Sequence, residues 1–197
     1  MQIAARHVGT ASRARARTVE PLSFESAESA ALSAEFQDSL VAIAAVAFAM
    51  EALELELEGA GHQLDNSKFI KPTRTNKGFY VAQRLIQVFK LDKKFEGRLP
   101  SQLQDLFELR HESVHFKSLT KHGTKPHPSG TNTAEELTVF TLERSIEAVR
   151  LGREILKECL ESIKLGHHAS ATAVVRELPG VLKMLDEVLS SEGISLA

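Results

Sequence analysis

The chain contains very little cysteine, tyrosine or tryptophan. Its 197 residues include one cysteine, one tyrosine and no tryptophan. A single cysteine excludes a disulfide framework within the chain, which suits a reducing compartment, and we expect a cytoplasmic protein. No stretch of alternating Val, Ile or Thr is bounded by turn residues, so strands are not predicted.

Long apolar runs and a strong net charge are missing as well. The longest unbroken apolar run extends only from Leu40 to Met50, whereas a helix that spans a bilayer needs about 20 residues. We therefore expect a buried helix segment there, and no membrane among the partners. The formal net charge is −2, so the chain lacks the positive excess of a general nucleic-acid binder.

The one strongly basic segment is the N-terminus. Residues 1–19 contain no acid and four arginines: Arg6, Arg13, Arg15 and Arg17. Basic tails of this kind are commonly solvated. We therefore predict that residues 1–21 form a basic, loosely ordered arm outside the folded core, available for contacts with phosphates.

Helical signals dominate the remainder. Residues 26–58 are rich in Ala, Leu and Glu and contain no Gly or Pro, which predicts a long first helix that ends at Gly59. Apolar positions at helical spacing predict a second helix over residues 79–91. Pro100 and Ser101 are typical of the start of a third helix.

A loop and a fourth helix follow. The prolines and glycines within residues 117–130 predict irregular structure. The polar start NTAEEL predicts that a helix begins at Asn132, since early acids favour a helix N-terminus. Its apolar stripe has one gap, filled by Arg153, which we expect to pair with an acid. Cys159 follows the stripe and is expected to be a small core residue.

The fold predicted from these elements is all-α. Residues 22–165 are expected to form an up-and-down four-helix bundle. Residues 166–197 form a C-terminal helical extension, in which Pro179 and Gly180 predict two short helices or one kinked helix.

The segment LFELRHESVHF, from Leu106 to Phe116, carries the most chemistry. On a helical wheel that starts at Leu103, Arg110 lies at about −20°, in the middle of the apolar stripe. A guanidinium there is costly unless it is paired or lines a cleft. Arg110 is therefore either a site residue or the partner of an acid of the first helix: Glu51, Glu54 or Glu58.

Within this segment, LRHESVHF, late in the third helix of a predicted bundle, resembles the R-x(4–6)-H signature of the HEPN superfamily. The resemblance rests on Arg110, His111 and His115. It implies a homodimer in which the third helices of two subunits face each other across one shared cleft. Many members are metal-independent endoribonucleases of toxin–antitoxin, antiphage or RNA-processing systems, and others bind nucleotides or act as scaffolds. An antitoxin protein is therefore an expected partner, although Lys117 stands where one subgroup has a tyrosine that its partner modifies.

The residue types are consistent with that chemistry. Attack of an RNA 2′-hydroxyl on the adjacent phosphate needs proton transfers and relief of charge at phosphorus. His115, with an ordinary pKa near 6.5, suits a general acid or base, and Arg110 offers a planar fork that matches a phosphate. His111 would support them, and no metal or other cofactor is required. Loop residues that would bind RNA are Lys117, His122 and His127, although exposure without a function is the alternative for the two histidines.

Two other functions remain open. Read as H-E-x-x-H, the same segment places His111 and His115 one turn apart as zinc ligands, with Glu112 as the general base of a hydrolase. The extended form of that motif would need Gly and His where the chain has Ser118 and Lys121. The other alternative is a non-catalytic dimeric helical module, in which the motif arginine pairs with an acid.

Overall fold

The computed structural model describes residues 1–19, 25–60, 73, 75–114, 124–128, 132–164 and 172–195. The described part is all-α, as predicted, and its helices are α1 (Gln2–Val19), α2 (Glu25–Gly59), α3 (Lys77–Phe89), α4 (Lys93–Val114), α5 (Leu142–Lys164) and α6 (Thr172–Ser191). The smaller elements are β1 (Thr124–Pro126), β2 (Asn132–Ala134) and a 3-10 turn, η1 (Glu135–Thr138). No helix within the described part is long and apolar enough to cross a membrane.

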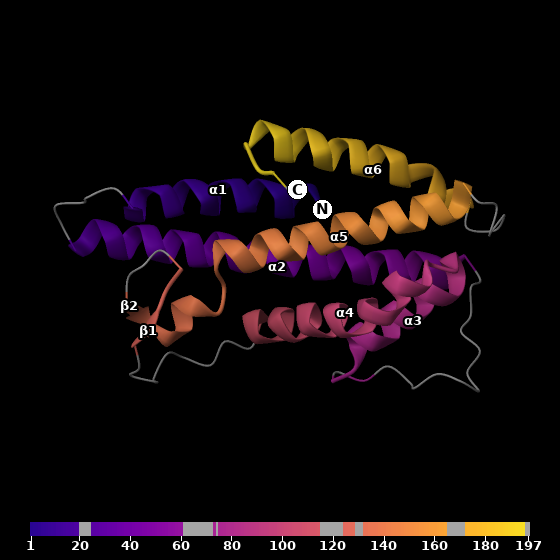
Figure 1. Ribbon diagram of the computed structural model, residues 1–197, viewed down its shortest axis with the longest axis horizontal. Helices are drawn as coiled ribbons and strands as arrows, with labels where there is room; N and C mark the ends of the chain where they lie inside the picture. Colours follow the sequence, from indigo (N-terminus) through magenta and orange to yellow (C-terminus); the bar gives the residue numbers. More distant parts are fainter. Residues whose placement is uncertain are drawn as a thin grey trace.

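Helix α2 is the centre of the molecule. It runs along the whole length, with α1, α5 and α6 on one side and α3 and α4 on the other (Figure 1). Its core residues include Ile43, Val46, Met50 and Leu57, which are fully buried. The long first helix predicted over residues 26–58 is thereby confirmed. A helix that is apolar on nearly every side is stable only when neighbours cover most of it, and five other helices contact α2 here.

The predicted N-terminal arm is wrong. Helix α1 is packed along α2 and also contacts α5 and α6. Its buried face is made of small apolar residues at helical spacing: Ala4, Ala5, Val8 and Ala11. Of the arginines that suggested a solvated tail, Arg6, Arg13 and Arg17 lie on the exposed face, whereas Arg15 is largely buried. Small side chains let α1 approach α2 closely, so burial here depends on alanines that carry little hydrophobic signal individually.

Two predicted helix boundaries are also wrong. Helix α4 begins at Lys93, where the side chain of Asp92 accepts a hydrogen bond from the Lys94 backbone amide at 2.9 Å, and Pro100 therefore lies inside the helix. Helix α5 begins at Leu142, ten residues after the predicted start at Asn132. The intervening segment instead contains β2, which pairs antiparallel with β1. Regular structure within residues 117–130 was not predicted, yet β1 lies there.

Over residues 172–195, the described part of the C-terminal extension, the chain forms one helix packed on α1 and α5. Helix α6 contains Pro179 rather than ending at it, and its leucines Leu182, Leu185 and Leu189 are buried. The predicted pairing of Arg153 is confirmed, because its guanidinium donates to the Asp186 carboxylate at 2.6 and 3.1 Å. That ion pair links α6 to α5.

Helices α3 and α4 cross very closely at Gly78. A β-carbon at this position would lie 2.4 Å from the Gln104 α-carbon and 2.5 Å from the Leu103 carbonyl oxygen. The buried Gln104 side chain reinforces the crossing, since its amide donates to the Thr75 carbonyl and to the Glu108 carboxylate at 2.9 Å each. The crossing fixes the position of α4, and with it the last turn that carries the motif.

Candidate functional site

The motif is only partly within the described structure. Arg110 and His111 lie in the last turns of α4. His115, Lys117 and His122 lie outside the described residues. The structure therefore bears on the positions of Arg110, His111 and His127, and the proposed roles of the other residues stay predictions.

Arg110 is held by two contacts with α2. Its guanidinium carbon lies 4.5 Å from the centre of the Phe48 ring, within the range of a cation–π interaction. Its Nη2 atom lies 3.5 Å from the Glu51 carboxylate, which is longer than a strong charge-assisted hydrogen bond. The side chain remains 28% exposed. Arg110 thus pairs with one of the acids expected from the sequence, but it is not sealed from solvent.

Glu51 belongs to a network of ion pairs, with alternating charges, that joins α2, α3 and α4. It also lies 3.4 Å from the Lys77 ammonium, which in turn lies 3.2 Å from Glu54. Glu54 then pairs with Arg84 at 2.8 Å, and both of these side chains are almost completely buried. Arg110 lies at one end of this network, and its side chain is the most exposed of the three cations in it. We infer that the buried pairs hold Glu51 in place and that Arg110 is the cation a ligand can reach.

His111 and Glu112 point in different directions from the same turn. His111 is half-buried at the C-terminal end of α4, where a helix dipole favours a cation. Glu112 is exposed and lines a groove between α4 and α5, which Arg110 and His111 do not line. No group of three or more His, Cys, Asp or Glu side chains in the described ranges is arranged to hold a metal ion. The zinc hypothesis requires His115, which the structure does not describe.

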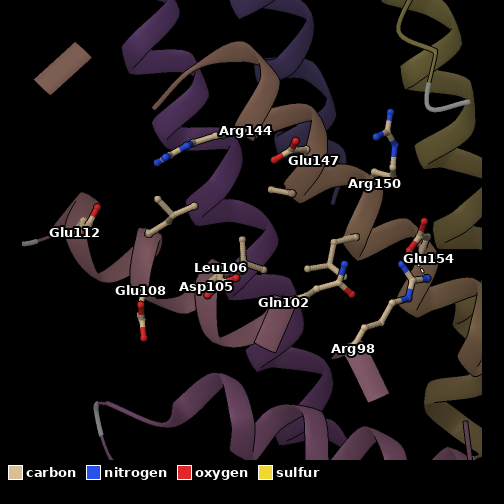
Figure 2. A pocket seen from close by; sticks show the side chains of 13 residues that line it. Arg98, Gln102, Asp105, Leu106, Glu108, Glu112, Arg144, Glu147, Arg150 and Glu154 are labelled. Carbon is tan, nitrogen blue, oxygen red and sulfur yellow. Dashed lines mark hydrogen bonds and ion pairs between the residues drawn. The ribbon is translucent and has the colours of Figure 1, made fainter. Parts of the chain in front are cut away.

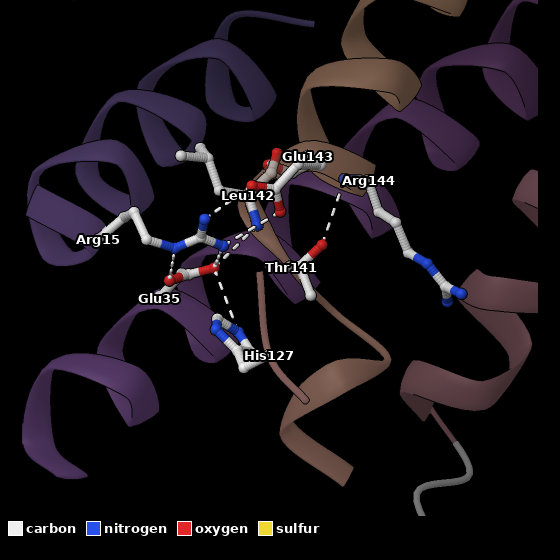
Figure 3. Close-up of polar contacts among 8 residues, drawn as sticks. Arg15, Glu35, His127, Thr141, Leu142, Glu143 and Arg144 are labelled. Carbon is white, nitrogen blue, oxygen red and sulfur yellow. Dashed lines mark hydrogen bonds and ion pairs between the residues drawn. The ribbon is translucent and has the colours of Figure 1, made fainter. Parts of the chain in front are cut away.

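His127 is buried, contrary to the expectation of an exposed loop histidine. Its Nε2 atom lies 3.7 Å from the carboxylate of Glu35, which is itself fully buried. That carboxylate accepts hydrogen bonds from Arg15 Nε at 2.6 Å and from the Leu142 backbone amide at 3.0 Å (Figure 3). Arg15 also donates to Glu143 at 2.7 Å. The cluster joins α1, α2, the β-hairpin and the start of α5, so His127 has a structural role.

The burial of this cluster changes the protonation of its members. Burial lowers the pKa of His127 below its ordinary value, and Arg15 adds to this effect, while Glu35 and Glu143 oppose it. Burial disfavours the charged form of Arg15, but hydrogen bonds to Glu35 and Glu143 outweigh it and raise the pKa of Arg15. The cluster is therefore expected to hold a neutral imidazole beside the charged guanidinium of Arg15.

A groove between α4 and α5 was not predicted. Its volume is about 720 Å³, and its lining carries five carboxylates and three guanidiniums. Leu106 lies near its centre with charged side chains around it, and Arg98 meets Glu154 at one end, 3.0 Å apart (Figure 2). Acidic positions at helical spacing on α4 are visible in the sequence, but their partner helix follows only from the fold.

The site at Arg110 can offer a partly exposed guanidinium to an anion, beside an exposed aromatic ring. Its charge is partly balanced by Glu51, which pairs with both Arg110 and Lys77. Cys159 is buried within α5, and burial raises the pKa of its thiol, so it is no nucleophile. Comparisons with protein-family models, curated proteins and solved structures found no match to the chain.

Proposed function

We propose that the protein is a HEPN-like homodimer that binds RNA and cleaves it without a metal, through Arg110 and His115 at a cleft shared by two subunits. The observation that carries this proposal is the placement of Arg110. A guanidinium held over Phe48 and only loosely bound to Glu51 at 3.5 Å is available to a phosphate. A phosphate oxygen at hydrogen-bonding distance would compete successfully with a carboxylate at that separation.

The part of α2 that the other helices leave uncovered favours the pairing of two subunits. Its residues Val41, Ala45, Phe48, Ala52 and Leu55 follow one another in steps of four and three along one stripe. Phe48 is 49% exposed and Leu55 is 56% exposed. Such spacing is what two helices need to interlock their side chains, and a stripe that pairs with its own copy closes under twofold symmetry. Because Arg110 rests on Phe48, pairing of this stripe would bring two Arg110 side chains to one interface.

The chemistry follows from those two residues. The RNA 2′-hydroxyl attacks the adjacent phosphorus, the bond from phosphorus to the 5′-oxygen breaks, and a 2′,3′-cyclic phosphate and a 5′-hydroxyl form. His115 of one subunit takes the proton of the 2′-hydroxyl, and His115 of the second subunit gives a proton to the leaving 5′-oxygen. Arg110 neutralises the negative charge on the phosphate oxygens. RNA is selected because DNA lacks the 2′-hydroxyl. An antitoxin as the regulating partner stays a prediction of the HEPN resemblance.

The test is cleavage of single-stranded RNA in the presence of a metal chelator. We expect the wild-type protein to cut, and Arg110→Gln to lose about 100-fold or more in rate, as expected when a group that stabilises transition-state charge is removed. Arg98→Gln is the matched control, because Arg98 lies on the same helix and pairs with Glu154 away from Phe48. Full activity of Arg110→Gln, or cleavage by the wild type only with added metal, would refute the proposal.

A non-catalytic dimeric module is the second candidate, and the contact between Arg110 and Glu51 favours it. In that case Arg110 serves to fasten α4 to α2. This candidate predicts a dimer that neither binds nor cuts RNA. It also predicts that Arg110→Gln lowers the free energy of unfolding without changing any RNA-dependent signal.

A further inference from the structure

The groove between α4 and α5 is a separate surface from the one that carries Arg110. Both helices pack on α2, yet they pack little against each other. The groove between them is about 720 Å³ in volume. Two helices backed by a third leave a position into which a further helix fits, as in a four-helix arrangement.

The lining of the groove suits an amphipathic helix. Leu106 and Leu109 on α4 lie one turn apart, as do Ala148 and Leu151 on α5, and all four line the groove. Leu106, Ala148 and Leu151 are buried and form its floor, and Leu109 is half-buried. Such pairs accept side chains that recur every three or four residues on a partner helix. The charged side chains surround this apolar strip, so the occupant needs an apolar face flanked by polar ones.

The charge of the lining selects a basic occupant. Five carboxylates stand against three guanidiniums. Arg98 is already paired with Glu154, and Arg144 donates to the Val139 carbonyl at 2.9 Å. Exposed acids such as Asp105 and Glu147 are left to interact with an occupant. Excess negative charge repels the phosphates of RNA and attracts lysine and arginine.

We propose that the groove between α4 and α5 binds a basic amphipathic helix of a partner protein. The apolar strip takes the leucine or alanine face of that helix, and Asp105 and Glu147 meet its lysines or arginines. This surface goes beyond the proposed RNA chemistry and does not depend on it, because Arg110 does not line the groove.

The test uses two designed helical peptides with the same leucine and alanine face, one flanked by lysines and the other by glutamates. Fluorescence anisotropy gives the dissociation constant of each. We expect the lysine peptide to bind at least about tenfold more tightly than the glutamate peptide. The double variant Asp105→Lys with Glu147→Lys is expected to weaken the lysine peptide by about tenfold or more, because like charges then face each other.

Glu177→Lys is the control, because it makes the same acid-to-lysine change, at one position instead of two, on an exposed part of α6 outside the groove. It should leave the dissociation constant within about twofold of the wild-type value. Equal binding of both peptides, or unchanged binding in the double variant, would overturn the proposal. A lower mass of the sedimenting assembly in the double variant than in the wild type would also overturn it, because that result would assign the groove to a second copy of the chain.

Discussion

Removing the carboxylate of Glu35 should lower the free energy of unfolding far more than removing an exposed carboxylate. Its side chain is 1% exposed and that of Arg15 is 13% exposed. Deleting one partner of a buried pair costs about 3–5 kcal/mol, because the other charge stays buried without compensation. Arg15 keeps its bond to Glu143, so we expect Glu35→Ala to cost about 3 kcal/mol, near the lower end of that range.

Thermal and urea unfolding followed by circular dichroism measure this loss. For a chain of this size about 1 kcal/mol shifts the melting temperature by about 2–4 °C, so Glu35→Ala should melt about 6–12 °C lower than the wild type. Glu187→Ala is the control, because its carboxylate is 62% exposed and lies 3.8 Å from Lys183. That change should cost less than about 1 kcal/mol.

A loss from Glu35→Ala as small as that of Glu187→Ala would refute the reasoning. It would mean that Arg15 and the start of α5 do not depend on this carboxylate. The double change Arg15→Met with Glu35→Leu gives a further check. Replacing both charges with apolar side chains is expected to recover most of the loss, because no buried charge then remains.

Three further predictions concern packing, pH and assembly. Gly78→Ala should lower the free energy of unfolding by about 1–3 kcal/mol, because its new methyl group meets the α4 backbone. Gly97 has open space around it, so Gly97→Ala should raise the free energy of unfolding by up to about 1 kcal/mol. Equal melting temperatures of the two variants would contradict this prediction. The free energy of unfolding should fall as the pH drops below 6.5, because the folded protein holds the pKa of His127 below that ordinary value and so binds the proton less readily than the unfolded chain does. His127→Gln should reduce this dependence on pH in urea titrations. An unchanged dependence would exclude His127 as its source. Phe48→Glu with Leu55→Glu should halve the mass measured by sedimentation velocity, and a wild-type monomer would remove α2 as an interface.

The helices were predictable where large apolar residues form a continuous run or recur at helical spacing. Residues 26–58 and 79–91 have continuous or periodic hydrophobic signals, and α2 and α3 lie there. Helix α1 was missed because alanines supply its buried face, and its arginines suggested a tail. The start of α5 was misplaced because the polar segment after Asn132 has the composition of a helix N-terminus. Its pairing with β1 is a contact between two segments, which composition does not encode.

The candidate site divides in the same way. An acid partner for Arg110 on the first helix was predictable, because a cation inside an apolar stripe needs compensation. That the partner is Glu51, and that Phe48 supports the guanidinium, depends on how α4 crosses α2. The burial of His127 depends on Glu35, 92 residues earlier in the chain, so a loop composition rich in proline and glycine suggested exposure instead.

The most direct test of the central claim is the binding of a single-stranded RNA to wild-type protein and to Arg110→Gln over a series of salt concentrations. If Arg110 meets a phosphate, the substitution weakens binding by about tenfold and lowers the slope of log affinity against log salt by about 0.7 for each lost contact. Arg98→Gln should change neither quantity. An Arg110→Gln protein with the affinity and salt slope of the wild type would contradict the account.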